Sequence, residues 1–180
     1  SGAAKAGSFE AGRRAVQEAI DRRCLSARVE HPQWAMDANV GMFALRFPDE
    51  GPSVTIVIPT FNQAGLLGQC IESLSQTAYR NYDVLIVDNG SDEPEALKLL
   101  EALNERTNHR VARIPKKNGV FNFAGLMNEA VAQASGELVL LLNNDTKVID
   151  PAWLGQMVGY MSMDGVGSVG ARLYFEDGTI

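Results

Sequence analysis

The sequence predicts an α/β fold in which an open, mostly parallel sheet carries helices on both faces. Three nearly unbroken apolar runs, 54–58, 84–87 and 138–142, are typical of strands buried on both faces. Segments with apolar residues at helical spacing alternate with these runs along the chain. Because parallel strands need long crossovers, this alternation favours strands joined by helices in one sheet.

Three helices are expected between these strands. The first includes Leu67 and Leu74, the second follows Pro94, and the third begins near Phe123. A short strand over 111–114 should separate the second helix from the third. The pattern then resembles a doubly wound sheet, which binds its ligands at the carboxyl ends of the strands.

A fourth helix and a last strand are expected near the end of the chain. Asp150 is a suitable N-cap, and Pro151 after it suits the first helical position. The segment 165–174 is expected to form a further strand. The sheet would then have five strands.

The first part of the chain has a different pattern. A helix is expected over 8–23, and two short β-like pieces follow at 27–30 and 42–47. A Pro-Asp-Glu-Gly-Pro break then ends the pattern as a linker would. We therefore expect a small α/β extension over 1–52 and a main domain over 53–180.

Composition restricts the classes of function. Hydrophobic residues make up 46% and charged residues 21% of the 180-residue chain, values ordinary for a globular protein. The net charge of −6 argues against nucleic acid as a partner, since binding phosphates needs clustered Lys and Arg. No apolar run is long enough to span a bilayer. Two cysteines without metal spacing fit a reducing, cytoplasmic setting, and a longer parent protein could hold the chain at the inner face of a membrane.

Polar or turn-forming clusters stand where four of the expected strands end, at 59–62, 88–92, 116–119 and 143–146. Each cluster alone is explained by a turn, because Asn-Gly and Asp-Asn-Gly are common turn formers. Together they should converge on one edge of a parallel sheet. Two of the clusters contain a carboxylate, which favours a ligand site over a set of unrelated turns.

The ordered motifs I-P-T-F-N, V-D-N-G-S, K-N-G and L-N-N-D-T resemble those of family 2 glycosyltransferases of the GT-A fold. The resemblance covers 53–180, and the L-N-N-D-T form is similar to that of rhamnosyltransferase-like members. It implies a pocket for a nucleotide sugar at the strand ends. A role in polysaccharide biosynthesis would follow.

The resemblance also assigns a role to residues at the first two strand ends. Pro59, Thr60 and Phe61 would line the base and ribose of the nucleotide. Asp88 would accept a hydrogen bond from the ring imide N–H of uracil or thymine. An ionised carboxylate only accepts hydrogen bonds, so it selects a base edge that presents a donor and rejects adenine.

Further residues match positions near the phosphates. Lys117 and Asn118 would hold the nucleotide there, and a lysine would offset the charge of the diphosphate. A plain solvated pair, Lys116 and Lys117, is an equally good explanation. Asn128 matches a recurring polar position, and it could equally cap or brace the loop.

The segment Asn143-Asn144-Asp145 occupies the place of the family's D-x-D motif. The resemblance gives Asn144 to the nucleotide and Asp145 to a metal, either Mn²⁺ or Mg²⁺. Both cations prefer oxygen ligands and would bridge Asp145 to the diphosphate. The alternative is that Asp145 and Thr146 only cap a turn.

The function implied is transfer of a sugar from a UDP- or dTDP-sugar to an acceptor hydroxyl, with inversion and with a metal. The acceptor would be a glycan, a lipid-linked molecule or another hydroxyl compound. The chain starts at Ser1 without Met and stops in mid-pattern, so we expect the donor-binding portion of a longer protein. The catalytic base is expected beyond Ile180 and is not assigned.

Three other functions share parts of this pattern. A nucleotidyltransferase also has an α/β sheet and a carboxylate-bound metal, but no glycine-rich basic loop follows the first strand here. A non-catalytic nucleotide-binding or scaffold module would keep the fold without the chemistry, and the asparagines in the D-x-D position are compatible with it. A dinucleotide dehydrogenase is excluded, because no G-x-G-x-x-G follows the first strand.

Overall fold

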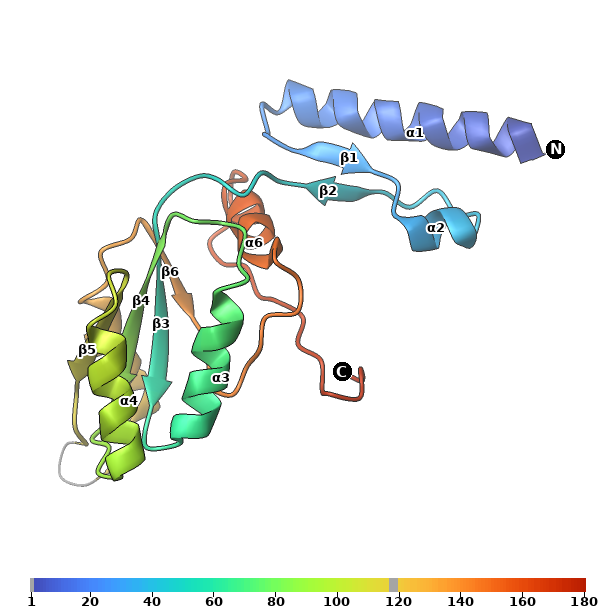
Figure 1. Ribbon diagram of the computed structural model, residues 1–180. Helices are drawn as coiled ribbons and strands as arrows, with labels where there is room; N and C mark the ends of the chain where they lie inside the picture. Colours follow the sequence, from blue (N-terminus) through green and yellow to red (C-terminus); the bar gives the residue numbers. More distant parts are fainter. Residues whose placement is uncertain (1, 117–119) are drawn as a thin grey trace. The chain divides into compact units, whose positions relative to one another are not determined.

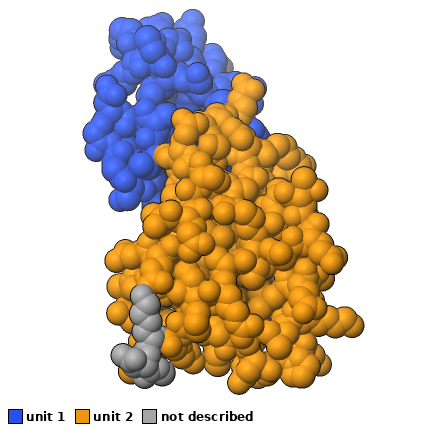
Figure 2. Space-filling view, turned by 90° about the vertical axis from the view of Figure 1, so that its left-hand side faces the viewer, with its two compact units in different colours: residues 1–49, 154–180 blue, residues 50–153 orange. Residues whose placement is uncertain are grey.

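The computed structural model describes residues 2–116 and 120–180, with the side chains from residue 7 onward. The chain divides into two compact units, Ser1–Asp49 with Leu154–Ile180, and Glu50–Trp153 (Figure 2). The division of the chain into a nucleotide-sugar-binding domain over 53–180 and an extension over 1–52 stays a prediction. The two units are described separately below.

The unit over 50–153 contains one four-stranded sheet (Figure 1). Its strands are β3 (Val54–Thr60), β4 (Tyr82–Asp88), β5 (His109–Arg113) and β6 (Leu138–Leu141). They lie in the order β5-β4-β3-β6 and all run parallel. The predicted open parallel sheet is confirmed for these strands.

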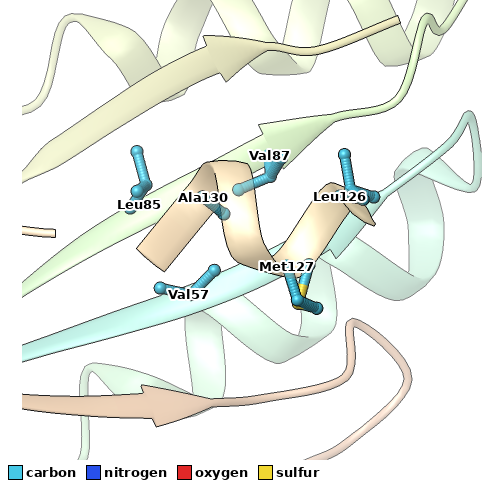
Figure 3. Close-up of a cluster of buried hydrophobic side chains, with 6 residues drawn as sticks. All are labelled: Val57, Leu85, Val87, Leu126, Met127 and Ala130. Atoms are coloured by element: carbon cyan, nitrogen blue, oxygen red, sulfur yellow. The ribbon is translucent and has the colours of Figure 1, made fainter. Parts of the chain in front are cut away.

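Helices cover both faces of this sheet. They are α3 (Ala64–Leu74), α4 (Pro94–Asn104) and α5 (Phe123–Val131). Figure 3 shows α5 with Leu126, Met127 and Ala130 turned towards Val57, Leu85 and Val87 of the sheet. Since successive strand residues point to opposite faces, Ile56, Ile58 and Ile86 turn to the other face, where α3 and α4 lie (Figure 1).

The register aligns the carboxyl ends of the strands. Thr60, the last residue of β3, pairs with Asp88, the last residue of β4. Asp88 in turn pairs with Arg113, the last residue of β5. Three strand ends therefore form one row, and the polar residues that follow them share one edge.

The other unit begins with helix α1 (Gly2–Arg22) and an antiparallel pair, β1 (Arg28–Glu30) and β2 (Ala44–Arg46). Between these strands lies the short helix α2 (Gln33–Asp37), which the sequence pattern did not predict. Helix α6 (Trp153–Met161) packs against the segment after β2. Gln156 exchanges hydrogen bonds with the backbone of Phe47, and a Cβ at Gly159 would overlap the Phe47 ring. A glycine is thus required where α6 meets this segment.

The prediction of a fifth strand over 165–174 is wrong. Within the described residues this segment forms no ladder, and it is almost entirely exposed, with Leu173 at 63%. Its three glycines disfavour a strand, and a strand also needs a neighbour for its backbone N–H and C=O groups. A turn forms after this segment at Asp177 and Gly178, with Gly178 at a φ of +82°.

None of the described helices combines the length and the apolar character needed to cross a bilayer.

Candidate functional site

The carboxyl ends of β3, β4, β5 and β6, with the loops that follow them, form what we term the strand-end edge. Thr60 and Asp88 lie side by side in the register of β3 and β4. The side-chain amide of Asn144, which follows β6, donates a hydrogen bond to Thr60 Oγ1 at 3.2 Å. Pro59 is half-buried beside Thr60. Segments far apart in the sequence therefore meet at this edge.

Asp88 is the most buried carboxylate of the edge, with 1% of its surface exposed. Its Oδ1 accepts the backbone N–H of Ser91 at 2.8 Å. Its Oδ2 lies 3.5 Å from Nε of Arg113, whose own guanidinium also donates to the Ser91 carbonyl at 2.7 Å. Backbone and guanidinium donors thus hold the carboxylate in one orientation. The sequence motifs did not predict that Arg113 contacts Asp88, because in sequence an arginine at a strand end cannot be told from a solvated arginine.

Asn62 joins the loop after β3 to the loop after β4. Its backbone N–H donates to Ser91 Oγ at 2.8 Å, and its side-chain amide donates to Asp92 at 3.0 Å. Its Oδ1 accepts the backbone N–H groups of Asp92 and Glu93 at 3.0 and 3.2 Å. Asn62 itself has a φ of +54°, a conformation that asparagine adopts more readily than most residues. The two loops are therefore braced as one body.

Phe61 presents an aromatic face at the same edge. Its side chain is 41% exposed, and Nζ of Lys116 lies 3.7 Å from the ring centroid. A cation over an aromatic face is attracted by the negative charge of the π system. Lys116 thus places a positive charge beside the Phe61 ring. The predicted phosphate-side residues Lys117 and Asn118 lie outside the described residues.

A pocket of about 220 Å³ lies where β4 and β5 end and α5 begins. Its lining includes Asn89, Ile114, Lys116 and Leu126. Asn89 is 5% exposed and donates through Nδ2 to the carbonyl of Ile114 at 2.8 Å. Its Oδ1 has no hydrogen-bond partner among the described residues, which leaves a buried acceptor in a residue that lines the pocket.

The side chain that caps α5 is Asn122, because its Oδ1 accepts the backbone N–H of Gly125 at 2.9 Å. Asn128, one of the residues considered for capping or bracing, lies inside α5 and is exposed. Capping is therefore not the role of Asn128.

Asp145, the residue expected to bind metal, is exposed. Within the described part of the chain it makes no hydrogen bond or ion pair, and no group of three His, Cys, Asp or Glu residues could hold a metal there. The oxygen ligands available to a cation in this loop are the carboxylate of Asp145 and the side-chain amide oxygens of Asn143 and Asn144. These are hard ligands that fit a divalent cation as a partial set, with the remaining ligands supplied by a bound molecule or water.

The thiol of Cys70 in α3 lies beneath this loop. It is 3.7 Å from the carbonyl of Asn143 and 4.0 Å from Oγ1 of Thr146. Burial raises the pKa of the Cys70 thiol; the charge of Asp145 adds to this and the contact with Thr146 opposes it. Cys70 is therefore a neutral packing residue near neutral pH.

A family model, described as glycosyl transferase family 2, matches residues 55–180. This range includes β3 from its second residue, the other three strands of the sheet and all four polar clusters.

Two curated proteins match nearly the whole chain. An uncharacterized protein of Sinorhizobium fredii, y4gI, is 40% identical over 98% of this chain. The O-antigen biosynthesis protein RfbC of Myxococcus xanthus is 37% identical over 95% of this chain. The chain spans only 19% and 13% of the length of these two relatives.

Solved structures share the fold. A mannosyltransferase from Pyrobaculum calidifontis, in complex with GDP-Man and Mn²⁺, aligns over 91% of this chain and 44% of its own, with a TM-score of 0.56 and 19% identity. Staphylococcus aureus TarS 1–349 in complex with UDP-GlcNAc aligns over 67% of this chain and 37% of its own, with a TM-score of 0.52 and 22% identity. The predicted α/β architecture of the GT-A type is confirmed. The chain belongs to glycosyl transferase family 2.

Proposed function

We propose that this chain forms the donor site of an enzyme that transfers a sugar from a nucleotide sugar to an acceptor hydroxyl. The observation that carries the proposal is the meeting of Thr60, Asp88 and Asn144 at one edge, one residue away from the exposed Asp145. An oriented buried acceptor beside an exposed carboxylate suits a ligand with a base at one end and a diphosphate at the other. The family of the chain supports the same function.

The base would lie at Phe61 and Asp88. The exposed ring of Phe61 provides a stacking face, from which Lys116 would have to withdraw if the base takes the same side. Asp88 would accept the imide N–H of uracil or thymine through Oδ2, the oxygen that faces Arg113. Adenine has no ring N–H at the matching position and would bind poorly. Guanine does have one, so GDP belongs among the nucleotides to be tested.

The diphosphate would lie near Asn144 and Asp145, and Lys117 and Asn118 would contribute there. Asp145 and the neighbouring amide oxygens would hold Mn²⁺ or Mg²⁺. The phosphates would supply further ligands, because the described residues offer only a partial set. When bound, such a cation would neutralise charge on the departing nucleoside diphosphate. The hydrogen bond from Asn144 to Thr60 would keep the loop, and thus the Asp145 carboxylate, close to the ribose side of the site.

For the transfer step we propose inversion, in which a general base removes the proton of the acceptor hydroxyl as that oxygen attacks the anomeric carbon. The acceptor class would be a glycan or lipid-linked hydroxyl. The base is not assigned among the described residues.

One observation favours a second candidate function. Asn143 and Asn144 stand in the D-x-D position, where only Asp145 is a carboxylate, and a non-catalytic nucleotide-binding module could tolerate this change. Release of nucleoside diphosphate from a nucleotide sugar distinguishes the two, because only the enzyme produces it.

The test of the proposal is isothermal titration calorimetry of the 180-residue chain with UDP, dTDP, GDP and ADP, each with Mn²⁺. We expect UDP or dTDP to bind at least about tenfold more tightly than ADP, the effect of one lost hydrogen bond to a charged group. As a control, Glu101→Ala, which removes an exposed carboxylate on α4, should bind the four nucleotides as the wild-type chain does. Equal affinity for all four nucleotides, or no binding at all, would contradict the proposal.

A further inference from the structure

The loop that carries Asp145 is fixed to the rest of the unit on both sides of that residue. On the β6 side, the backbone N–H of Leu142 donates to the carbonyl of Val57 at 2.9 Å, and Asn144 reaches Thr60. On the other side, the backbone N–H of Val148 donates to Oγ of Ser73 at 3.0 Å. Asp145 itself stays exposed, so the chain on either side of it, and not a partner of its carboxylate, holds it in place.

Ser73 belongs to the last turn of α3 and is 8% exposed. Its hydroxyl donates to the carbonyl of Cys70 at 2.7 Å while it accepts from Val148. The donated bond points the hydrogen back into α3 and leaves a lone pair for Val148. The bond to Cys70 therefore orients the Ser73 hydroxyl so that its oxygen can accept the N–H of Val148.

Two more bonds fix the loop further along. The backbone N–H of Ala78 donates to the carbonyl of Pro151 at 2.8 Å. The indole N–H of Trp153 donates to Oγ1 of Thr77 at 3.0 Å. Among these fixed points beyond Asp145, the bond to Ser73 is the one nearest to it in sequence, since Val148 is only three residues away.

The turn that contains Asp145 also has a hydrogen bond of its own. Oγ1 of Thr146 donates to the carbonyl of Asn143 at 2.7 Å, which closes the turn around Asp145. Without the Ser73 anchor this turn would stay closed, but the segment between Thr146 and the next fixed point, at Pro151, could move. The Asp145 carboxylate would then sample more positions, and binding a cation would have to restrict them again.

We infer that Ser73 is a positioning residue for the metal function of Asp145, an inference that rests on the proposed function. Ser73 touches neither nucleotide nor cation in this account. Ser73 fixes the loop through Val148, so replacing Ser73 should reduce the gain in nucleotide affinity that the cation provides. Binding of nucleotide without cation, which depends on Phe61 and Asp88, does not need it.

The experiment measures the affinity of the 180-residue chain for UDP with and without Mn²⁺, for wild type, Ser73→Ala and Ser73→Thr. The matched control is Ser75→Ala, since the exposed hydroxyl of Ser75, the C-cap of α3, donates to the carbonyl of Glu72 in that helix and makes no contact with the Asp145 loop among the described residues. We expect Ser73→Ala to lose about five- to tenfold of the affinity gained from Mn²⁺, the effect of one net hydrogen bond. Its affinity without Mn²⁺ should stay within about twofold of wild type. Ser73→Thr, which keeps the hydroxyl, should restore most of the gain, and Ser75→Ala should resemble wild type.

The outcomes separate this inference from the function on which it rests. A wild-type chain whose affinity for UDP does not respond to Mn²⁺ overturns the metal function of Asp145 and the inference with it. A normal response in wild type and an equal response in Ser73→Ala overturns the inference alone. An equal loss with and without Mn²⁺, or failure of Ser73→Thr to restore the gain, also overturns it, because the role of Ser73 would then be only structural.

A second measurement needs no variant and covers the case in which Ser73→Ala does not fold. Amide hydrogen exchange of the wild-type chain should show protection of the Val148 N–H, which bonds to Ser73, relative to the N–H of exposed Asp145. Equal exchange at the two amides would contradict the anchor.

Discussion

The side-chain amide of Asn144 donates a hydrogen bond to the hydroxyl of Thr60 across 3.2 Å, and this bond connects the loop after β6 to the end of β3. Thr60 is also the register partner of Asp88. A contact between residues 84 positions apart therefore brings the expected metal loop next to the expected base site.

Thr60→Val should weaken both the edge and nucleotide binding. Valine keeps the β-branched shape, but it removes the acceptor of Asn144 and leaves that amide without its partner. The Thr60 hydroxyl also donates to the carbonyl of Asn62 at 3.3 Å, so two hydrogen bonds are lost and we expect the free energy of unfolding to fall by about 1–3 kcal/mol. Urea unfolding measures it, with the exposed Thr107→Val as the control. An unfolding free energy equal to that of the control variant would show that these bonds do not stabilise the edge.

Asp88→Asn should reduce the free energy of UDP binding by more than it reduces the free energy of unfolding. The amide oxygen can still accept the N–H of Ser91, but the charge facing Arg113 is lost and an N–H₂ group replaces one acceptor. A base that presents an imide N–H then meets a donor, and we expect about tenfold or more weaker binding of UDP. Calorimetry checks this. Unchanged affinity would remove Asp88 from the base site.

Phe61→Ala should lower the affinity for every nucleotide by a similar factor. Stacking depends on the flat face of a base and is tolerant of its identity, with an effect of about 1–3 kcal/mol per base. A control with another exposed phenylalanine is Phe175→Ala, whose side chain is 70% exposed in the other unit. A loss for UDP alone, with ADP and GDP unaffected, would be inconsistent with a stacking face.

Thiol titration should detect one reactive cysteine in the folded chain and two after denaturation. Cys24 is exposed, whereas Cys70 is buried and its pKa is raised mainly by that burial. A raised pKa means that the neutral thiol predominates at pH 7 to 8, so the nucleophilic thiolate is scarce as well as shielded. Cys24→Ser should remove the fast reaction entirely. Rapid labelling of Cys70 in the folded protein would show that the loop over it opens easily.

The sheet could be predicted because its strands are buried on both faces, which leaves a clear mark in sequence. The run over 54–58 consists almost wholly of β-branched residues, and it became a strand with nearly complete burial. The segment 165–174 has three glycines among its ten residues, and it has no strand beside it among the described residues. Composition describes one strand at a time, while pairing is a property of two, and this is why that prediction failed.

The site could be predicted only in part. The motif order identified Thr60, Asp88 and Asn144, and the parallel topology brought them together. Arg113 and Ser73 could not be found in this way, because an arginine at a strand end and a serine in a helix have many ordinary roles. Their contacts with Asp88 and Val148 exist only in three dimensions.

The most direct test of the proposed donor site is the dependence of UDP affinity on Mn²⁺ in the wild-type chain and in Asp145→Ala. Asp145 is exposed, so its replacement should leave the fold and the metal-free affinity unchanged. We expect Mn²⁺ to increase the affinity of wild type for UDP about tenfold or more, and to have little effect in Asp145→Ala. An equal increase in both proteins, or no increase in wild type, would contradict a donor site in which Asp145 holds a metal against the diphosphate.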